Sequence, residues 1–169
     1  MKKVIFLDFD GVLNTENYQA LLRDTGEPCW DDFGQVFDPA AVESLKMLLE
    51  AVPDALLVIN SSWKLEGLAR MKELWKVRGL PGKIHSMTPD YVPDLRNIDL
   101  DNYDNIVLLA GKGNEVKQWL EENAPEDCKY VILDDVPDFL PDQNPHLILT
   151  NPKTGITMED AVMAIEILK

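Results

Sequence analysis

The stretch that most constrains the fold is residues 4–14, near the start of the chain. Residues 4–7 are apolar without a break, which is typical of a strand buried on both faces at the centre of a parallel sheet. Asp8 and Asp10 follow, and strand alternation predicts that their side chains leave the sheet on roughly the same side. Gly11 then lets the backbone turn away from the sheet. Because ligands bind at the carboxyl ends of strands in open α/β sheets, we expect a site here.

Strand-like and helix-like patterns alternate along the rest of the chain. Short, mostly apolar runs at residues 55–59, 106–109, 130–133 and 146–149 predict further strands, and residues 83–85 are a candidate for another short one. Helical periodicity predicts helices at about 38–53, 65–78, 114–120 and 157–168, the first capped by Asp38 with Pro39 at its first position. Leu65 and Val162 are expected on the inward faces of the second and last helices. The alternation predicts an α/β fold, a doubly wound, mostly parallel sheet flanked by helices.

The length of 169 residues predicts one domain spanning residues 1–169. Two stretches without clean periodicity, at about 15–36 and 88–111, are expected to be small insertions: the first a loop or short helical segment, the second a long surface loop. Neither is the size of a large cap domain. Cys29 and Cys128 are isolated in the sequence, so we expect neither a disulfide framework nor a cysteine metal site.

The composition excludes some classes of function more readily than it selects one. A net charge of −14 argues against a protein that grips nucleic acid by its phosphates. No apolar run approaches the ~20 residues of a membrane span, and the opening Met-Lys-Lys does not resemble a signal peptide, so we expect a cytoplasmic protein. The basic residues within 64–83 are interpreted as a solvated helix face, with a docking surface for an anionic substrate as the alternative.

Polar residues that could take part in catalysis or binding lie at three later positions, each at the end of a predicted strand or just before a predicted helix. Ser61 lies where a strand meets a helix, with Ser62 as the alternative in register, and either serine also fits simple helix capping. Lys112 lies between two glycines before a helix, where it also fits a solvated lysine. Asp134 and Asp135 close the apolar run 131–133, and Asp138 follows four residues after Asp134; acids of a surface turn are the alternative interpretation.

The sequence Asp-Phe-Asp-Gly-Val at residues 8–12 resembles the first motif of the haloacid dehalogenase-like (HAD) phosphohydrolases. Ser61, Lys112 and the pair Asp134-Asp135 resemble the second, third and fourth motifs, in the same order and across almost the whole chain. With Ser-Ser-Trp-Lys at residues 61–64, the chain most resembles the compact HAD domains of RNA-repair proteins and their stand-alone relatives. Lys64 stands where those domains lead us to expect arginine.

The resemblance implies a phosphomonoester hydrolase that depends on Mg²⁺. It implies that Asp8 is the nucleophile that forms an aspartyl phosphate, and that Asp10 first protonates the leaving oxygen and then activates water. The implied phosphate-binding groups are Ser61 or Ser62, Gly11 and Lys112. The implied metal ligands are the carboxylates of Asp8 and Asp134 and the backbone carbonyl of Asp10, with Asp135 or Asp138 orienting a metal-bound water.

Electrostatics independently predict a bound cation. The four carboxylates expected at one edge of the sheet would repel each other, by ~4 kcal/mol for each pair 4 Å apart at an effective dielectric of 20. Oxygen ligands of this kind suit Mg²⁺. The expected partner is a phosphorylated substrate, which the sequence leaves open among a small molecule, a polynucleotide end and a phosphoprotein. The alternative function is a non-catalytic HAD-like domain that binds metal, phosphate or a protein partner. The oligomeric state is not predicted.

Overall fold

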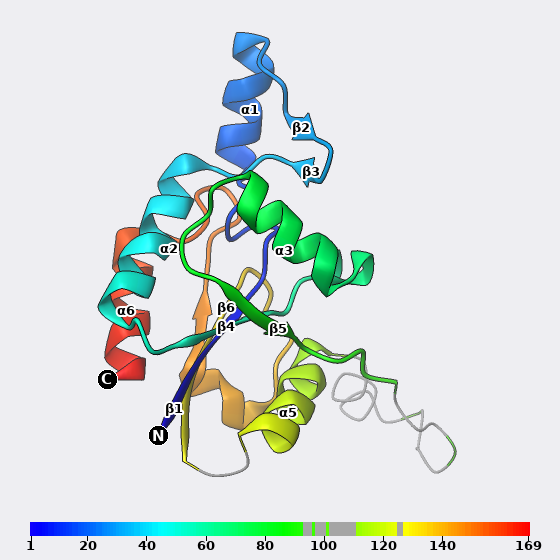
Figure 1. Ribbon diagram of the computed structural model, residues 1–169, viewed down its shortest axis with the longest axis vertical. Helices are drawn as coiled ribbons and strands as arrows, with labels where there is room; N and C mark the ends of the chain where they lie inside the picture. Colours follow the sequence, from blue (N-terminus) through cyan, green and yellow to red (C-terminus); the bar gives the residue numbers. More distant parts are fainter. Residues whose placement is uncertain (93–95, 97–100, 102–110, 125–126) are drawn as a thin grey trace.

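The computed structural model describes residues 1–92, 96, 101, 111–124 and 127–169 (Figure 1). The strand predicted at 106–109 and most of the loop predicted at 88–111 lie outside the described residues. The described residues include every candidate site residue, from Asp8 to Asp138.

The core is a five-stranded parallel sheet in the order β5-β4-β1-β6-β7. Its strands are β1 (Lys2–Leu7), β4 (Leu56–Ile59), β5 (Ile84–Met87), β6 (Cys128–Asp134) and β7 (Leu147–Leu149). The chain moves outward from β1 to β4 and β5, and then returns to the other side of β1 for β6 and β7. The direction of winding therefore reverses between β1 and β6, which is the switch point where ligands bind in such sheets.

Helices cover both faces of the sheet, as predicted for a doubly wound fold (Figure 1). Helices α2 (Pro39–Ala51), α3 (Leu68–Val77) and α6 (Met158–Leu168) contribute to the same hydrophobic cluster as Ile5 and Leu7 of β1. Helix α5 (Lys112–Asn123) packs on the opposite face against Val4 and Phe6. All four of these β1 residues are fully buried, because a central parallel strand has apolar cover on both sides.

Two helix starts form as the sequence predicts. Asp38 accepts a hydrogen bond from the backbone N–H of Ala40 at 2.9 Å, and Pro39 occupies the first turn of α2. Thr157 and Asp160 form a reciprocal capping box at the start of α6. The prediction of a helix start at Asn114 was wrong, because α5 begins at Lys112 with Gly111 as its N-cap.

Two predicted inward positions are exposed instead. Leu65 is 75% exposed because residues 62–66 form a short 3₁₀ helix, η1 (Ser62–Glu66), and α3 starts only after Gly67. Val162 is 51% exposed, since α6 buries the face that carries Ala161, Ala164 and Leu168. Helical spacing alone did not fix which of two adjacent apolar stripes faces the core.

The insertion at 15–36, which we call the flap, is a small folded unit. It consists of α1 (Glu16–Thr25) and a hairpin of β2 (Trp30–Asp31) and β3 (Gly34–Gln35), and it rises above the carboxyl end of the sheet (Figure 1). Thr15 caps the start of α1, and Gly26 ends it with a positive φ of 72°. Of the two structures expected for this stretch, a loop or a short helical segment, the helical one is present, followed by a hairpin that was not predicted. The described residues contain no large cap.

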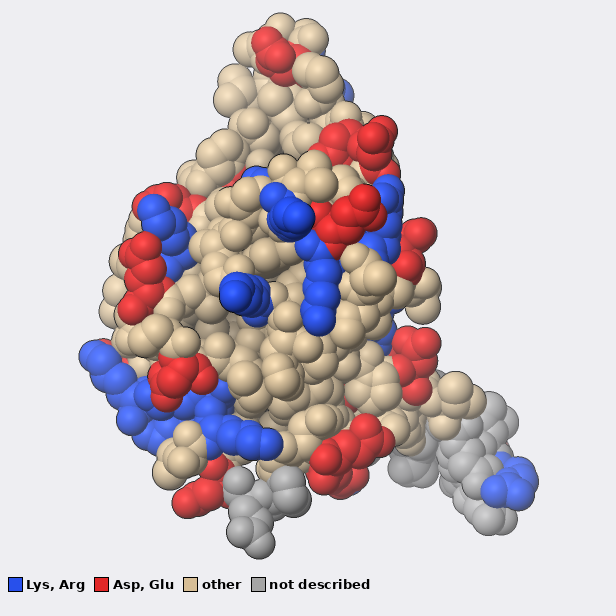
Figure 2. Space-filling view, in the orientation of Figure 1, with Lys and Arg blue, Asp and Glu red and all other residues tan. Residues whose placement is uncertain are grey.

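Several lysines lie on the face formed by α3 and β5, where Figure 2 shows Lys and Arg side chains spread over a mainly uncharged surface. Lys72, Lys76 and Lys83 are exposed there, as expected for a solvated helix face. Lys64 is an exception and is discussed with the site. Cys29 and Cys128 are both free. Among the helices of the described residues, none combines the length and apolarity needed to cross a membrane.

Candidate active site

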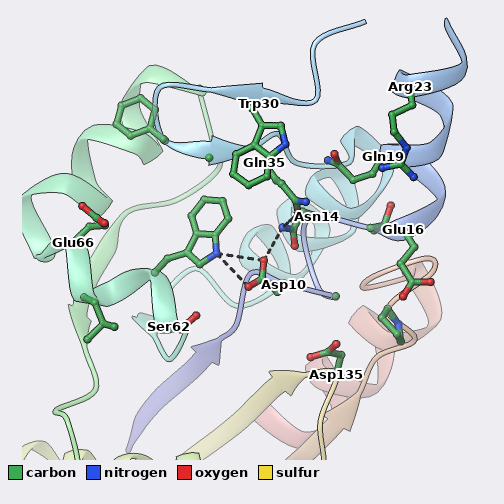
Figure 3. A pocket seen from close by; sticks show the side chains of 17 residues that line it. Asp10, Asn14, Glu16, Gln19, Arg23, Trp30, Gln35, Ser62, Glu66 and Asp135 are labelled. Atoms are coloured by element: carbon green, nitrogen blue, oxygen red, sulfur yellow. Dashed lines mark hydrogen bonds between the residues drawn. The ribbon is translucent and has the colours of Figure 1, made fainter. Parts of the chain in front are cut away.

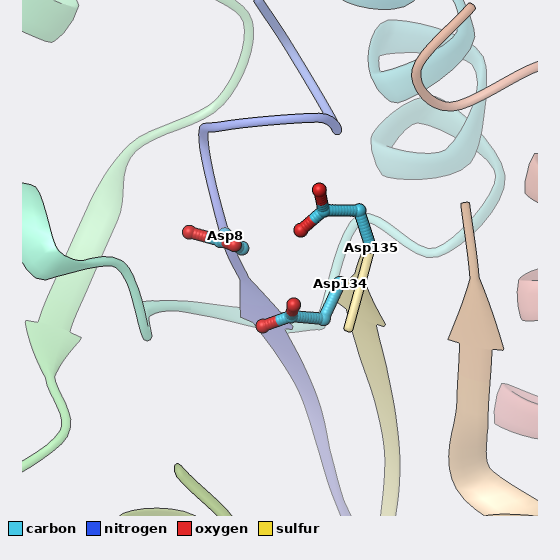
Figure 4. A group of neighbouring side chains, drawn as sticks. All are labelled: Asp8, Asp134 and Asp135. Carbon is cyan, nitrogen blue, oxygen red and sulfur yellow. The ribbon is translucent and has the colours of Figure 1, made fainter. Parts of the chain in front are cut away.

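Three carboxylates converge at the switch point between β1 and β6 (Figure 4). Asp8 directly follows β1, Asp134 is the last residue of β6, and Asp135 follows it; one carboxylate oxygen of each lies within 4.8 Å of the others. Asp8 is only 4% exposed and Asp134 is fully buried, while Asp135 is half-buried. This oxygen-only donor set at the edge of a cavity fits a hard divalent cation such as Mg²⁺.

Lys112 joins the two buried acids of this cluster. Its ammonium nitrogen lies 2.9 Å from Asp8 Oδ2 and 2.8 Å from Asp134 Oδ2. Because Lys112 is the first residue of α5, the helix that covers the opposite face of the sheet brings this cation to the strand ends. The predicted first, third and fourth motifs therefore meet in space although more than a hundred residues separate Asp8 from Lys112.

The burial of these charges shifts their pKa values. Burial raises the pKa of Asp134 to about 7, the charge of Asp8 adds to the rise, and Lys112 opposes it. Burial also raises the pKa of Asp8, against the attraction of Lys112 and a hydrogen bond from the Phe9 N–H. For Lys112, burial favours the neutral form, but the two carboxylates outweigh it and raise the lysine pKa. The cluster is thus short of positive charge even with the lysine in place.

The structure separates the roles of Asp135 and Asp138. Asp135 belongs to the three-acid cluster, and its carboxylate fills the space beside Gly11: a Cβ added to Gly11 would lie 2.3 Å from Asp135 Oδ2. Asp138 instead accepts hydrogen bonds at the start of α5, from the Lys112 N–H to Oδ2 at 3.3 Å and from the Gly113 N–H to its carbonyl at 3.1 Å. Asp138 therefore positions the helix that carries Lys112.

The side chain of Asp10 does not join the cluster, contrary to the expectation that it leaves the sheet beside Asp8. Strand β1 ends at Leu7, so the two-residue alternation no longer holds at Asp10, and Gly11 turns the chain with a φ of 73°. The Asp10 carboxylate accepts hydrogen bonds from Asn14 Nδ2 at 2.7 Å and from Trp63 Nε1 at 3.2 Å (Figure 3). Two donors from different segments hold this exposed acid at the wall of a pocket.

Ser61 and Ser62 differ in burial. Ser61 is 1% exposed and its oxygen accepts a hydrogen bond from the Trp63 N–H at 3.3 Å, so it caps η1. Ile59 pairs with Leu7, and the Asn60 N–H donates to the Leu7 carbonyl at 2.8 Å, so the segment that carries Ser61 begins beside the end of β1. Ser62 is exposed and lines the pocket. The capping interpretation of Ser61 is confirmed, and its position beside β1 leaves the phosphate-binding role as a prediction.

Lys64 is a residue whose environment the sequence did not predict. Its side chain is 6% exposed, and its ammonium group lies 2.8 Å from Glu115 Oε2 and 3.4 Å from Asp90 Oδ1. It also donates to the hydroxyl and carbonyl oxygens of Thr88 and to the carbonyl of Pro89. These partners lie 24 to 51 residues away along the chain, so no local pattern marks them.

The pocket of about 790 Å³ lies between the flap and the acid cluster. Figure 3 shows Asp10, Asp135 and Ser62 toward one end of it, and Trp30 and Arg23 on the flap toward the other. Its wall includes three aromatic side chains, which are Trp30, Phe33 and Trp63. The flap residues among these showed no periodicity in the sequence and were not predicted as site residues.

Comparison with known proteins agrees with this geometry. Residues 4–161 match the family model described as the HAD domain in Swiss Army Knife RNA repair proteins. The matched region begins within β1 and ends within α6, so it contains the flap and every motif residue discussed above. Neither a search of curated proteins nor a search of solved structures returned a match.

Proposed function

Because the chain belongs to the family of HAD domains found in Swiss Army Knife RNA repair proteins, we propose that it is a Mg²⁺-dependent phosphomonoester hydrolase. Family membership supports a HAD-type phosphohydrolase; the metal, the mechanism and the catalytic residues are our proposal. The observation that carries it is the contact of Lys112 with both buried acids, Asp8 and Asp134, at the switch point of the sheet. A cation between two carboxylates neutralises the site for the approach of an anionic phosphate.

In this proposal Asp8 is the nucleophile. Its carboxylate is held by the Phe9 N–H on one oxygen and by Lys112 on the other. In the first step a bond forms between an Asp8 oxygen and phosphorus, while the bond from phosphorus to the leaving oxygen breaks. Lys112, already at hydrogen-bond distance from Asp8, also faces the transferring phosphoryl group. Ser61, in the segment next to the end of β1, is the proposed hydroxyl donor to that group.

Asp10 is the proposed acid and base. Its carboxyl group is fixed by Asn14 and Trp63 at the pocket wall, away from the buried cluster, where a leaving group would sit. It gives its proton to the leaving oxygen in the first step. It then takes a proton from the water that attacks phosphorus and frees Asp8, so that protons balance over the cycle.

Asp8, Asp134 and Asp135 are the carboxylates that would hold Mg²⁺, together with the backbone carbonyl of Asp10. The fit rests on the chemistry of the donors: three carboxylates within 4.8 Å of one another, two of them with raised pKa values. The bound ion would supply positive charge to the acids and to the phosphate oxygens. Asp138 is occupied at the start of α5 and is not needed as a ligand.

The test is hydrolysis of a generic aryl phosphate with Mg²⁺ and after exhaustive chelation. We expect turnover only with the metal, and we expect the Asp8→Asn variant to be inactive under both conditions. Undiminished activity in chelator would refute the metal assignment. An inactive wild-type protein that still binds Mg²⁺ and phosphate would favour the alternative of a non-catalytic binding domain.

A further inference from the structure

We infer that the pocket beneath the flap is the leaving-group site, and that it accepts the uncharged planar ring of a small phosphomonoester of the nucleoside monophosphate type. The inference rests on the proposed function, since it concerns which ester the acid cluster cleaves. It goes beyond that function by naming the substrate class and the residues that select it.

The pocket is placed where a leaving group must lie. Asp10 and Gly11 line it and follow Asp8 closely in the chain, and Asp135 connects it to the acid cluster. Asp10 points into it with its carboxyl group held from two sides (Figure 3). A phosphoryl group at Asp8 would therefore have its ester oxygen facing Asp10 and the rest of the substrate beneath the flap.

Aromatic side chains make this pocket suited to a flat ring. Trp63 is held rigidly: its ring centroid lies 5.3 Å from that of Phe9, its indole N–H binds Asp10, and Gly34 of the flap touches its edge closely enough that an added Cβ would lie 3.0 Å away. Trp30, on the flap, is 65% exposed. Stacking of bases on such side chains tolerates any base, because every base has a π face.

Hydrogen bonds within the protein hold the polar part of the pocket wall. Asn14 and Gln19 are 4% and 5% exposed. The Asn14 amide nitrogen donates to Asp10 and to Gln35, and the Gln19 amide nitrogen donates to the Val36 carbonyl. Asn14 thus joins Asp10 to β3 of the flap.

The charge of the pocket argues against a substrate with further phosphates. Its charged lining side chains are Asp10, Glu16, Glu66 and Asp135 against the single cation Arg23. Even with Asp135 neutralised by a metal, three carboxylates face one guanidinium. Polynucleotide binding needs the opposite balance, because affinity comes largely from lysine and arginine on phosphates. A volume of about 790 Å³ is in the usual range for one small molecule.

Binding without chemistry gives the first test. Adenosine, which carries no phosphate, is titrated into the Asp8→Asn protein and followed by calorimetry. We expect binding that weakens about tenfold or more in an added Trp30→Ala change, as expected for loss of one stacking partner, and that persists in Trp30→Phe. The matched control is Val162→Ala, an exposed apolar residue remote from the pocket, which should bind adenosine unchanged.

Kinetics give the second test. With adenosine 5′- and 3′-monophosphate, Trp30→Ala should lower kcat/KM about tenfold or more, the same stacking loss, and this loss should exceed the loss for glycerol 3-phosphate, which has no ring. Val162→Ala should leave kcat/KM for both kinds of ester unchanged. Equal effects on both esters, or adenosine binding that ignores Trp30, would overturn the inference while leaving the hydrolase intact. A preference for 3′- or 5′-phosphorylated oligonucleotides over the mononucleotides would overturn it as well. Adenosine binding that depends on Trp30, with no phosphatase activity on any ester, would instead refute the proposed function and keep the ring site.

Discussion

The buried carboxylate of Asp134 gives the protein a stability cost that depends on pH when no metal is bound. Its pKa rises from 3.8 to about 7 on folding, through burial first and the charge of Asp8 second. An acid with a raised pKa in the folded state holds its proton more tightly there than in the unfolded chain. Its contribution to stability is therefore complete below about pH 4 and is lost as the pH rises through about 7.

The magnitude can be worked from this shift. A rise of about three pKa units, at ~1.4 kcal/mol per unit, sets an upper limit of about 4 kcal/mol on the cost of ionised Asp134 above pH 7. Asp134→Asn removes that cost. It also loses a hydrogen bond, since asparagine has one oxygen where the two aspartate oxygens accept from the Val136 N–H and from Lys112; a bond to a charged group contributes about 1.5–3 kcal/mol. The net gain expected at pH 8 is at most about 1–2.5 kcal/mol, the difference between these two terms.

The assay is thermal unfolding in chelator at pH 5 and at pH 8. At pH 8 Asp134→Asn should melt above wild type by up to about 2–10 °C, at the ~2–4 °C per kcal/mol expected for a chain of this size. At pH 5 the unfolded-state aspartate, with a pKa of 3.8, is already ionised, so about 1.7 kcal/mol of that cost is present. The lost hydrogen bond offsets it at that pH, so the variant should melt at or slightly below wild type. Asp24→Asn, an exposed acid on α1, is the control and should shift neither melt. A variant that melts below wild type by the same amount at both pH values would refute the reasoning.

Two further substitutions test the site and its support. Asp10→Asn should lower turnover about 10²–10⁴-fold through lost proton transfer, and with an aryl phosphate that needs little protonation it should accumulate a phosphoryl adduct on Asp8, seen by intact and peptide mass spectrometry. Wild-type turnover by this variant would contradict the division of labour. Lys64→Met should destabilise the fold by about 3–5 kcal/mol in urea unfolding, because the half-buried Glu115 carboxylate and the buried Thr88 oxygens lose the cation that binds them. Exposed Lys72→Met should change it by less than about 0.5 kcal/mol.

The sequence predicted the parts of the site that strand ends determine. Residues 4–7 and 131–133 are apolar without a break, so each had to be a strand buried on both faces, and the acids that follow had to meet at one edge of a parallel sheet. Lys112 was predicted to precede a helix, and its order along the chain matched the third motif; the helix in fact begins at Lys112 itself. Its contact with both acids needed the sheet topology, which places α5 across from β1 and β6.

The pocket could not be predicted, because its wall comes from irregular structure. Trp30 belongs to a two-residue strand. Gln19 belongs to α1, and its buried side chain donates to the Val36 carbonyl within the flap. Neither residue therefore follows the periodicity of an element packed on the sheet. The direction of Asp10 was missed for a related reason. The two-residue alternation that predicts side-chain direction ends with the strand, one residue before Asp8.

Lys64 shows how a residue outside the acid cluster can still shape it. It lies three residues after Ser61 and directly after Trp63, and its ammonium group binds Glu115, one helical turn after Lys112. The segment around Lys64 contains Ser61 and also Trp63, which donates to Asp10. The buried ammonium group of Lys64 thus joins this segment to the helix that supplies Lys112. Arginine at this position would carry the same charge on a larger, planar group with five donors. Lys64→Arg should therefore lower the free energy of unfolding less than Lys64→Met does. The difference in aryl phosphate turnover between the two variants then measures how far the ion pair sets the spacing between Lys112 and Asp10.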